Sequence, residues 1–226
     1  AASDVYKRQG ANPLNIVNNG VCVNRQGKRF IDEGKTYVQM SREVAANTPD
    51  NWAFMVCDQT AHDIPILKND WASYARTKAP VYTGNTLEEA AKAAGIDPKA
   101  LKKTIEDYNE AIEDGEAMKM SPVNTLPKPP VVKKAPFYIV PFQGGMTATF
   151  GGPLINTNGQ VLDTENQVIP GLFCIGNAAG GLFYDNYVGG AQLTSAGVFG
   201  MTVAEYVKGL QLSLIHISEP TRPEPI

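Results

Sequence analysis

The order of apolar and polar residues in the first half of the chain predicts a small sheet covered by helices. Residues 15–23 alternate weakly, and after a turn at 24–27 (NRQG) the extended pattern resumes at 28–31, as in a hairpin. Residues 37–46 follow a helical pattern. Residues 52–57 (WAFMVC) form a short continuous apolar run, which is typical of a buried strand.

A pair of helices is predicted next. Residues 86–94 form the first, which ends at Gly95, and Asp97 with Pro98 gives the second a capping side chain and a proline in its first turn. The second helix has one apolar face, made by Leu101, Ile105, Tyr108 and Ile112. Residues 115–136 are rich in lysine and proline without a period, which predicts a crossing loop or linker.

From Phe137 onward the pattern changes to short strands and glycine turns. Residues 137–142 are predicted to form a strand that carries a proline near its end. The turn at 157–159 (TNG) joins residues 153–156 and 160–163 into a hairpin.

Two further segments have the pattern of a ligand-binding backbone. The apolar run 171–175 (GLFCI) leads directly into Gly176-Asn177, and such a strand end is where an α/β sheet usually presents a ligand. Gly189-Gly190 opens a helix that runs to about Lys208. Glycines at that place let a ligand approach the exposed N–H groups, whose partial positive charge suits an anion. The same glycines also allow close packing, so this pattern alone leaves both interpretations open.

Composition and charge indicate no macromolecular partner. With 226 residues, of which 43% are hydrophobic, the chain can bury a core and hold one or two domains. Its 20 basic and 23 acidic residues are scattered and give a net charge of −3, which indicates neither nucleic acid nor an anionic membrane surface. No apolar run reaches the length of a membrane span, so no membrane insertion is expected.

The metal-binding and catalytic residue types are sparse. The three cysteines lie far apart without a CxxC motif, and their apolar neighbours indicate buried thiols. His62 is the only histidine outside the last residues of the chain, which argues against a histidine-based metal or triad site.

The two ends of the chain differ from the rest. Residues 1–10 and 212–226 carry no apolar period that continues into their neighbours, and both resemble translated sequencing-adaptor sequence. We therefore expect both ends to be non-native segments that lie outside the fold.

Three ordered segments resemble the C-terminal, FAD-contacting part of the fumarate reductase and succinate dehydrogenase flavoprotein family. Their sequences are GGMTATFGGPLINTNGQVL, IPGLFCIGNAAGGLFYDNY and VGGAQLTSAGVFG. The earlier NNGVCVNRQGKRFIDEG resembles the start of the family's substrate-capping domain, and NTLEEAAKAAGIDPKALKKTIEDYN resembles its helix pair. The resemblance covers the chain from about residue 11 to residue 210.

The resemblance implies an α/β fold with FAD as the cofactor. It divides the chain into an α+β substrate-capping domain at 11–136 and the C-terminal part of a Rossmann-like FAD-binding domain at 137–211. The family's N-terminal half holds the ADP part of FAD, and its GxGxxG motif after a strand does not occur in this sequence. We therefore expect a fragment that is inactive alone and needs this missing half. The compartment, bacterial cytoplasm or export, and the electron donor stay open.

The resemblance also implies a substrate that is less anionic than fumarate. In the dicarboxylate-reducing branch an arginine proton donor follows the stretch that matches residues 29–33 (RFIDE), and Tyr37 stands in its place here. Ala148 stands at that branch's histidine, and Tyr187 at its carboxylate-binding arginine. Without these groups two carboxylates find no partners, so neither fumarate nor succinate is expected as the substrate.

Two other branches fit these tyrosines. Ketosteroid dehydrogenases resemble the chain at Glu33-x-x-x-Tyr37 and at Tyr187 followed by glycines. The tricarballylate dehydrogenase branch resembles residues 180–200 more closely in length and order, but three carboxylates would find only Arg42 in the helix of the capping domain. The sequence leaves the two branches open.

All branches share one chemistry, which gives the candidate residues their roles. Flavin N5 exchanges a hydride with one carbon of a carbon–carbon bond next to a carbonyl, and a positioned acid or base exchanges a proton with the other carbon. Tyr37 is the candidate for that proton, and a phenol acts more readily as an acid, which favours reduction. Tyr187, or the N–H groups just after it, would polarise the carbonyl. The expected FAD contacts are Gly151, Gly176, Asn177, Gly190, Ala191, Gln192 and Leu193.

A second class of function is kept beside the enzyme. The same fold could serve a binding or sensor protein that retains flavin without turnover, because a fold does not fix a function. Tyr37 could also be an amphipathic side chain whose hydroxyl group meets water, and Asn177 could simply cap a turn.

Overall fold

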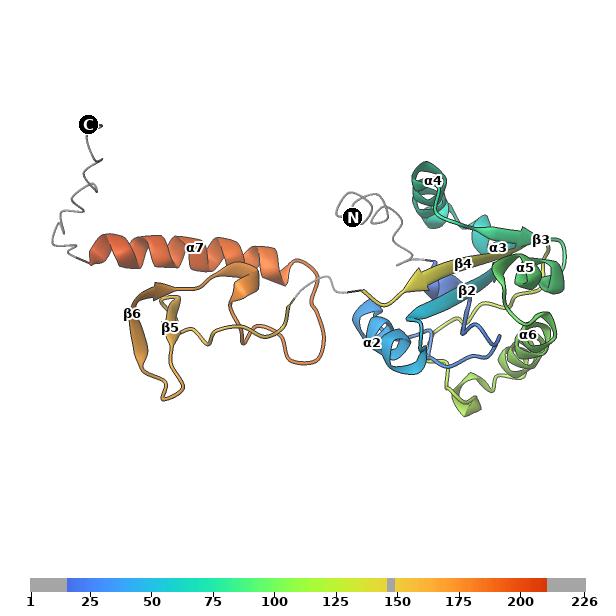
Figure 1. Cartoon of the computed structure of the whole chain (residues 1–226), viewed down its shortest axis with the longest axis horizontal. Helices are drawn as coiled ribbons and strands as arrows, with labels where there is room; N and C mark the ends of the chain where they lie inside the picture. The colour runs from blue at the N-terminus through green and yellow to red at the C-terminus, as the bar shows by residue number, and fades with distance from the viewer. Residues whose placement is uncertain (1–15, 146–148, 211–226) are drawn as a thin grey trace, which may run out of the picture. The chain divides into compact units, whose positions relative to one another are not determined.

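The computed structural model describes residues 16–145 and 149–210 of the chain. Two compact units divide the chain between Met146 and Thr147, and each unit is described by itself (Figure 1). The predictions made for residues 1–10, for residues 212–226 and for Ala148 lie outside the described residues.

The first unit is built on an antiparallel sheet of four strands in the order β1-β2-β4-β3. Its long central strands, β2 (Trp52–Asp58) and β4 (Phe137–Gln143), pair along their whole length. The edge strands are β1 (Val21–Val23) and β3 (Tyr82–Gly84). Strands far apart in the sequence therefore meet at the centre of the sheet.

Both faces of this sheet are buried, which explains the continuous apolar run of β2. Phe54 and Val56 belong to one hydrophobic cluster, whereas Ala53 and Met55 between them belong to another. Side chains alternate between the two faces of a strand, so a strand covered on both sides needs apolar residues at every position.

Helices supply the other half of each cluster. The helices α5 (Leu87–Ala94) and α6 (Pro98–Glu113) contribute to the cluster around Val56, and α2 (Tyr37–Asn47) and α4 (Lys68–Thr77) to the cluster around Met55. The predicted pair of helices against a small sheet is thereby confirmed.

Capping residues fix where three of these helices begin. Thr36 and Thr86 form capping boxes at α2 and α5, and the Asp97 carboxylate accepts hydrogen bonds from two N–H groups of α6. Gly95 ends α5, as predicted, and it adopts the left-handed conformation there.

Other elements differ from the prediction. The helices α3 (Gln59–His62) and α4 and the strand β3 were not predicted, because α4 is largely polar and β3 is only three residues long. The second arm of the first predicted hairpin is reduced to a bridge between Val23 and Arg29. Single 3₁₀ turns complete the unit: η1 (Val17–Asn19), η2 (Pro65–Leu67) and η3 (Ala117–Lys119).

The segment 115–136 is irregular, as predicted, but it is tightly anchored and is no free linker. The Asn109 side chain pairs with the backbone N–H and carbonyl of Val132, both at 2.8 Å. The Asp58 carboxylate accepts hydrogen bonds from the N–H groups of Lys133 and Lys134, both at 2.9 Å. The strand that follows, β4, completes the sheet of the first unit. The domain boundary at residue 136, which the family resemblance implied, stays a prediction.

The second unit consists of one hairpin and one long helix. The strands β5 (Gln160–Leu162) and β6 (Val168–Phe173) pair with each other, and the turn η4 (Gly176–Ala178) leads on toward α7 (Ala191–Gly209), as Figure 1 shows. The predicted pairing of 153–156 with 160–163 is present as a bridge between Ile155 and Val161. None of the helices in the described ranges is long and apolar enough to cross a bilayer.

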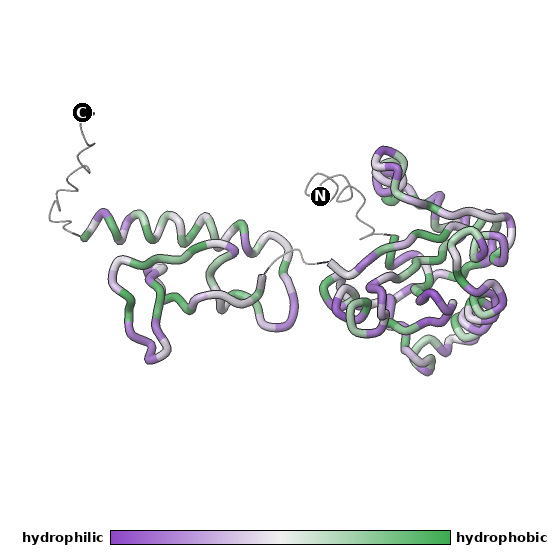
Figure 2. Tube along the Cα trace, in the orientation of Figure 1, coloured by the Kyte–Doolittle hydropathy of each residue, from purple (hydrophilic) through white to green (hydrophobic). Residues whose placement is uncertain are grey.

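The described part of the second unit buries little of its apolar surface. Among its hydrophobic residues only Val161 is buried. Large apolar side chains stay exposed along α7 and β6, where Figure 2 shows hydrophobic colouring. They include Ile169, Leu172, Leu193, Val198 and Met201. A surface of this kind usually meets another part of a protein.

Candidate functional site

Tyr37 lies at the start of α2, where a capping box fixes the helix terminus. The Gln39 N–H donates to the Thr36 hydroxyl at 3.5 Å, and the Thr36 N–H donates to Gln39 Oε1 at 3.2 Å. The Tyr37 side chain is 37% exposed. It therefore stands at the surface of the first unit, on a helix end whose position is set.

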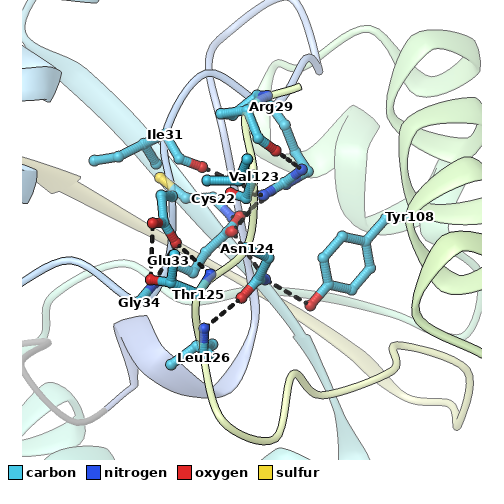
Figure 3. Close-up of polar contacts among 12 residues, drawn as sticks. Cys22, Arg29, Ile31, Glu33, Gly34, Tyr108, Val123, Asn124, Thr125 and Leu126 are labelled. Atoms are coloured by element: carbon cyan, nitrogen blue, oxygen red, sulfur yellow. Dashed lines mark hydrogen bonds and ion pairs between the residues drawn. The ribbon is translucent and has the colours of Figure 1, made fainter. Parts of the chain in front are cut away.

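A buried ion pair joins Arg29 to Glu33, and Glu33 lies four residues before Tyr37 (Figure 3). The Arg29 guanidinium donates to both oxygens of the Glu33 carboxylate, at 3.0 and 2.6 Å. The Cys22 N–H donates to the same carboxylate at 3.0 Å, and the Glu33 side chain is 0% exposed. The charges of the pair are thus satisfied by each other and by the backbone of β1.

Asn124 joins this ion pair to the segment 115–136. Its amide donates to Glu33 Oε2 at 3.1 Å and to the Tyr108 hydroxyl at 3.2 Å, while Arg29 donates to the Pro122 carbonyl at 2.9 Å. Burial and the nearby Glu33 carboxylate raise the pKa of Tyr108, so this phenol stays neutral. The network therefore anchors the segment 115–136 to the buried ion pair.

Asp32 closes the turn that leads to Tyr37. Its carboxylate accepts from the Thr125 N–H at 2.9 Å, from the Thr125 hydroxyl at 2.8 Å and from the Gly34 N–H at 2.8 Å. Gly34 packs so closely on Thr125 that an added Cβ would collide with the Thr125 hydroxyl oxygen. The approach to Tyr37 is thereby held against a segment distant in the sequence.

Asp32 is expected to make the first unit sensitive to acid. Burial by itself would raise the pKa of Asp32, but the hydrogen bonds from Thr125 and Gly34 outweigh this effect and lower the pKa below its ordinary value. A lowered pKa gives stability that is present above the ordinary pKa and is lost as the pH falls through the folded-state value. Urea midpoints measured between about pH 2 and pH 6 should therefore fall at the acid end, and Asp32→Asn should flatten that fall. An equal acid dependence in both proteins would contradict this role.

Two segments of the second unit lie side by side at the end of β6. The Thr149 hydroxyl donates to the Asn177 carbonyl at 2.9 Å, and the Gly180 N–H donates to the Pro153 carbonyl at 3.0 Å. Residues 149–153, with Gly151, therefore run along residues 176–180. Gly176 has a φ of 62°, the left-handed conformation that glycine adopts without strain.

Gly152 makes this approach possible, because a Cβ there would collide with the Ala178 carbonyl and reach the Gly180 nitrogen at 2.8 Å. Gly152→Ala is expected to cost about 1–3 kcal/mol through overpacking and to weaken FAD binding about tenfold or more. The ratio of bound FAD to protein, read from visible absorbance, checks this. Gly209→Ala is the control, since an added Cβ there meets nothing within 4 Å. Equal FAD content in the two variants would contradict the expectation.

The first turn of α7 presents backbone N–H groups. Gly190 is the N-cap residue, with a φ of 84°, and it precedes Ala191, Gln192 and Leu193. The first N–H groups of any helix lack acceptors within the helix, and they carry its positive end. Leu193 is 81% exposed whereas Gln192 is buried. The turn can therefore receive an electronegative atom on its backbone.

Tyr187 lies just before this turn and belongs to a row of aromatic rings. Its N–H donates to the Asn186 side chain at 2.9 Å. Its ring centroid lies 5.1 Å from that of Phe183, and the Phe183 centroid lies 5.2 Å from that of Phe150. The row thus links Tyr187 to the residue before Gly151.

The structure groups the predicted residues in two places. Tyr37 belongs to the first unit, and the other candidates belong to the second. The sequence interpretation missed Gly152, although the GG doublet marked it, and it missed Phe150, Phe183 and Asn124, for which neither a period nor a motif gave a signal. Across the described ranges, the acidic, cysteine and histidine side chains form no cluster that could hold a metal ion.

Comparisons with known proteins match most of the chain. A family model described as FAD binding domain matches residues 12–193. The urocanate reductase of Eggerthella lenta is 30% identical over 190 residues, which are 83% of this chain and 31% of that protein. The chain thus spans about a third of this relative's length.

Solved structures show the same fold. The open conformation of a flavocytochrome c3 fumarate reductase matches with a TM-score of 0.66 and 28% identity, over 83% of this chain and 32% of that one. The 3-ketosteroid delta1-dehydrogenase of Sterolibacterium denitrificans matches with a TM-score of 0.66 and 24% identity, over 86% and 40% of the two chains, and shares the fold.

Proposed function

Because this chain belongs to the FAD binding domain family, we propose that it forms part of an FAD-dependent oxidoreductase acting on a carbon–carbon bond next to a carbonyl. The observation that carries the proposal is a glycine-lined backbone surface in the second unit, where residues 149–153, residues 176–180 and the start of α7 belong to one compact body. FAD supplies the hydride chemistry when it is bound.

The backbone of the second unit fits such a cofactor. Gly151 has no side chain, and the next residue, Gly152, packs closely against residues 176–180. A flat ligand at this place would therefore meet mainly backbone atoms. We assign FAD contacts to Gly151, Gly176 and Asn177 at the strand end. At the helix start we assign them to Gly190, Ala191, Gln192 and Leu193. The N–H groups of Gln192 and Leu193 suit an electronegative atom, whereas the Ala191 N–H donates to the Val188 carbonyl at 3.1 Å.

Charge supports a substrate other than fumarate. In the described residues 149–210 the only lysine or arginine is Lys208, in the last turn of α7, far along the helix from Gly190. Two carboxylates need cationic partners when they leave water. An enone or an unsaturated acid with less charge fits this part of the chain better.

The two tyrosines take the roles that the chemistry needs. Tyr37, at the fixed start of α2, would give the proton that accompanies hydride transfer, and a neutral phenol is suited to reduction. Tyr187, or the N–H groups that follow it, would polarise the carbonyl. Both assignments are proposals about the whole enzyme.

A partner for the second unit is part of the proposal. Exposed apolar residues along α7 and β6 support a covering body, and we propose that it is an N-terminal half that holds the ADP part of FAD. In that scheme residues 11–136 form the substrate-capping domain and residues 137–211 the C-terminal part of the FAD-binding domain.

Turnover separates this enzyme from a flavin-retaining sensor. The protein that combines this chain with the proposed N-terminal half is loaded with FAD, reduced with dithionite without oxygen, and mixed with an enone. Reoxidation of the flavin with one equivalent of saturated ketone formed supports the enzyme. Bound FAD that no enone and no unsaturated acid reoxidises supports the sensor.

A further inference from the structure

We propose that the aromatic row of Phe150, Phe183 and Tyr187 binds a planar ring of the substrate, so that the enzyme prefers unsaturated carbonyl compounds that carry such a ring. This inference rests on the proposed function, because it concerns the substrate of the same site. It goes further in naming the chemical class and the side chains that select it.

The row is continuous from one end to the other. The Phe150 and Phe183 centroids are 5.2 Å apart with planes tilted by 40°, and the Phe183 and Tyr187 centroids are 5.1 Å apart with planes tilted by 48°. These separations lie within the range of favourable aromatic pairs. All three rings are partly exposed, so they can contact a further ring as well as each other.

The row joins the two segments to which FAD contacts are assigned. Phe150 directly precedes Gly151 and Gly152, and Gly152 lies against Ala178 and Gly180. Tyr187 directly precedes the Val188-Gly189-Gly190 segment that opens α7. Because these contacts lie within one unit, a ring on the row would be next to both segments that face the cofactor.

Three exposed neighbours of the row are large and mostly apolar. Leu182 is 45% exposed, Val188 67% and Tyr184 98%. Asp185 is the only charged residue among residues 182–188. An apolar ring gains by leaving water here, whereas a carboxylate would find no lysine or arginine among residues 182–188.

A second aromatic pair of the same unit provides a matched control. Phe173 and Tyr206 join β6 to α7, with centroids 6.1 Å apart. This pair links the strand to the helix away from the segment 182–188. A substitution there removes an aromatic contact of the second unit without touching the row.

Two ketones that differ only in the ring test the proposal. Benzylideneacetone carries a phenyl group where 3-penten-2-one carries a methyl group, and both are reduced at the same kind of bond. The measurement is the ratio of kcat/KM for the phenyl ketone to kcat/KM for the methyl ketone. It is made on the FAD-loaded protein that includes the proposed N-terminal half.

We expect the unaltered protein to favour the phenyl ketone and Phe183→Leu to lower the ratio about tenfold, the effect of losing about 1.4 kcal/mol of ring contact. Phe150→Leu is a second variant with the same expectation, in case Phe183→Leu does not fold. Phe173→Leu should keep the ratio. FAD content is measured in each variant so that a cofactor defect is recognised.

The outcomes separate the two proposals. Reduction of both ketones with no preference, or an equal loss of ratio in Phe183→Leu and Phe173→Leu, would overturn the aromatic-row proposal and leave the proposed function standing. If the FAD-loaded protein reduces neither ketone and no unsaturated acid, both proposals fall.

Discussion

Replacing Glu33 by alanine is expected to lower the free energy of unfolding of the first unit by about 3–5 kcal/mol. The side chains of Arg29 and Glu33 are 6% and 0% exposed, so the substitution leaves a buried guanidinium without its partner. It also removes the acceptor of the Cys22 N–H and of the Asn124 amide. Urea unfolding followed by tryptophan fluorescence measures the loss, because both tryptophans, Trp52 and Trp71, lie in the first unit.

Glu43→Ala is the matched control for this prediction. Glu43 pairs with Lys35 at 2.6 Å, but the two side chains are 33% and 35% exposed. Solvent screens an exposed pair, so the expected loss is at most about 1 kcal/mol. If Glu33→Ala cost no more than Glu43→Ala, the buried network would not be the anchor described above.

Tyr37→Phe is expected to lower kcat by a factor of about 10² to 10⁴, the usual contribution of a positioned proton donor. Only the hydroxyl group is removed, and the capping box of Thr36 and Gln39 does not depend on it. The FAD content and the urea midpoint should therefore stay close to those of the unaltered protein. Steady-state reduction of 3-penten-2-one with a reduced viologen dye as electron donor checks the prediction.

Tyr82→Phe provides the comparison for Tyr37→Phe. Tyr82 begins the edge strand β3, which pairs with β4, and it plays no part in the proposed chemistry. A kcat for Tyr37→Phe within about twofold of that for Tyr82→Phe would show that another group supplies the proton.

Local signals predicted the parts of the fold that local chemistry controls. The run WAFMVC forms the central strand β2, and Thr86, Gly95 and Asp97 cap their helices as predicted. The strand β3 escaped prediction because pairing with β4 decides its structure, and three residues carry too little pattern. The contact of Asn124 with Glu33 spans 91 positions, so no period along the chain could predict it.

The site also divides into features that local sequence predicted and features that depend on contacts between distant segments. The family, the α/β class and FAD, predicted from the three glycine-rich segments, are confirmed by the match to residues 12–193 and by the shared fold. The close approach of Gly152 to residues 176–180 and the aromatic row depend on contacts between segments, which the sequence does not carry. The roles of Tyr37 and Tyr187 stay predictions.

The most direct test of the account is the rate at which two acceptors reoxidise the reduced flavin. The FAD-loaded protein is reduced with dithionite in a stopped-flow apparatus without oxygen, and flavin absorbance is followed after mixing with an uncharged enone or with fumarate. The account predicts reoxidation by the enone at least about 100-fold faster than by fumarate, the factor that a missing charge partner of about 3 kcal/mol gives. Reoxidation by fumarate as fast as by the enone would contradict it.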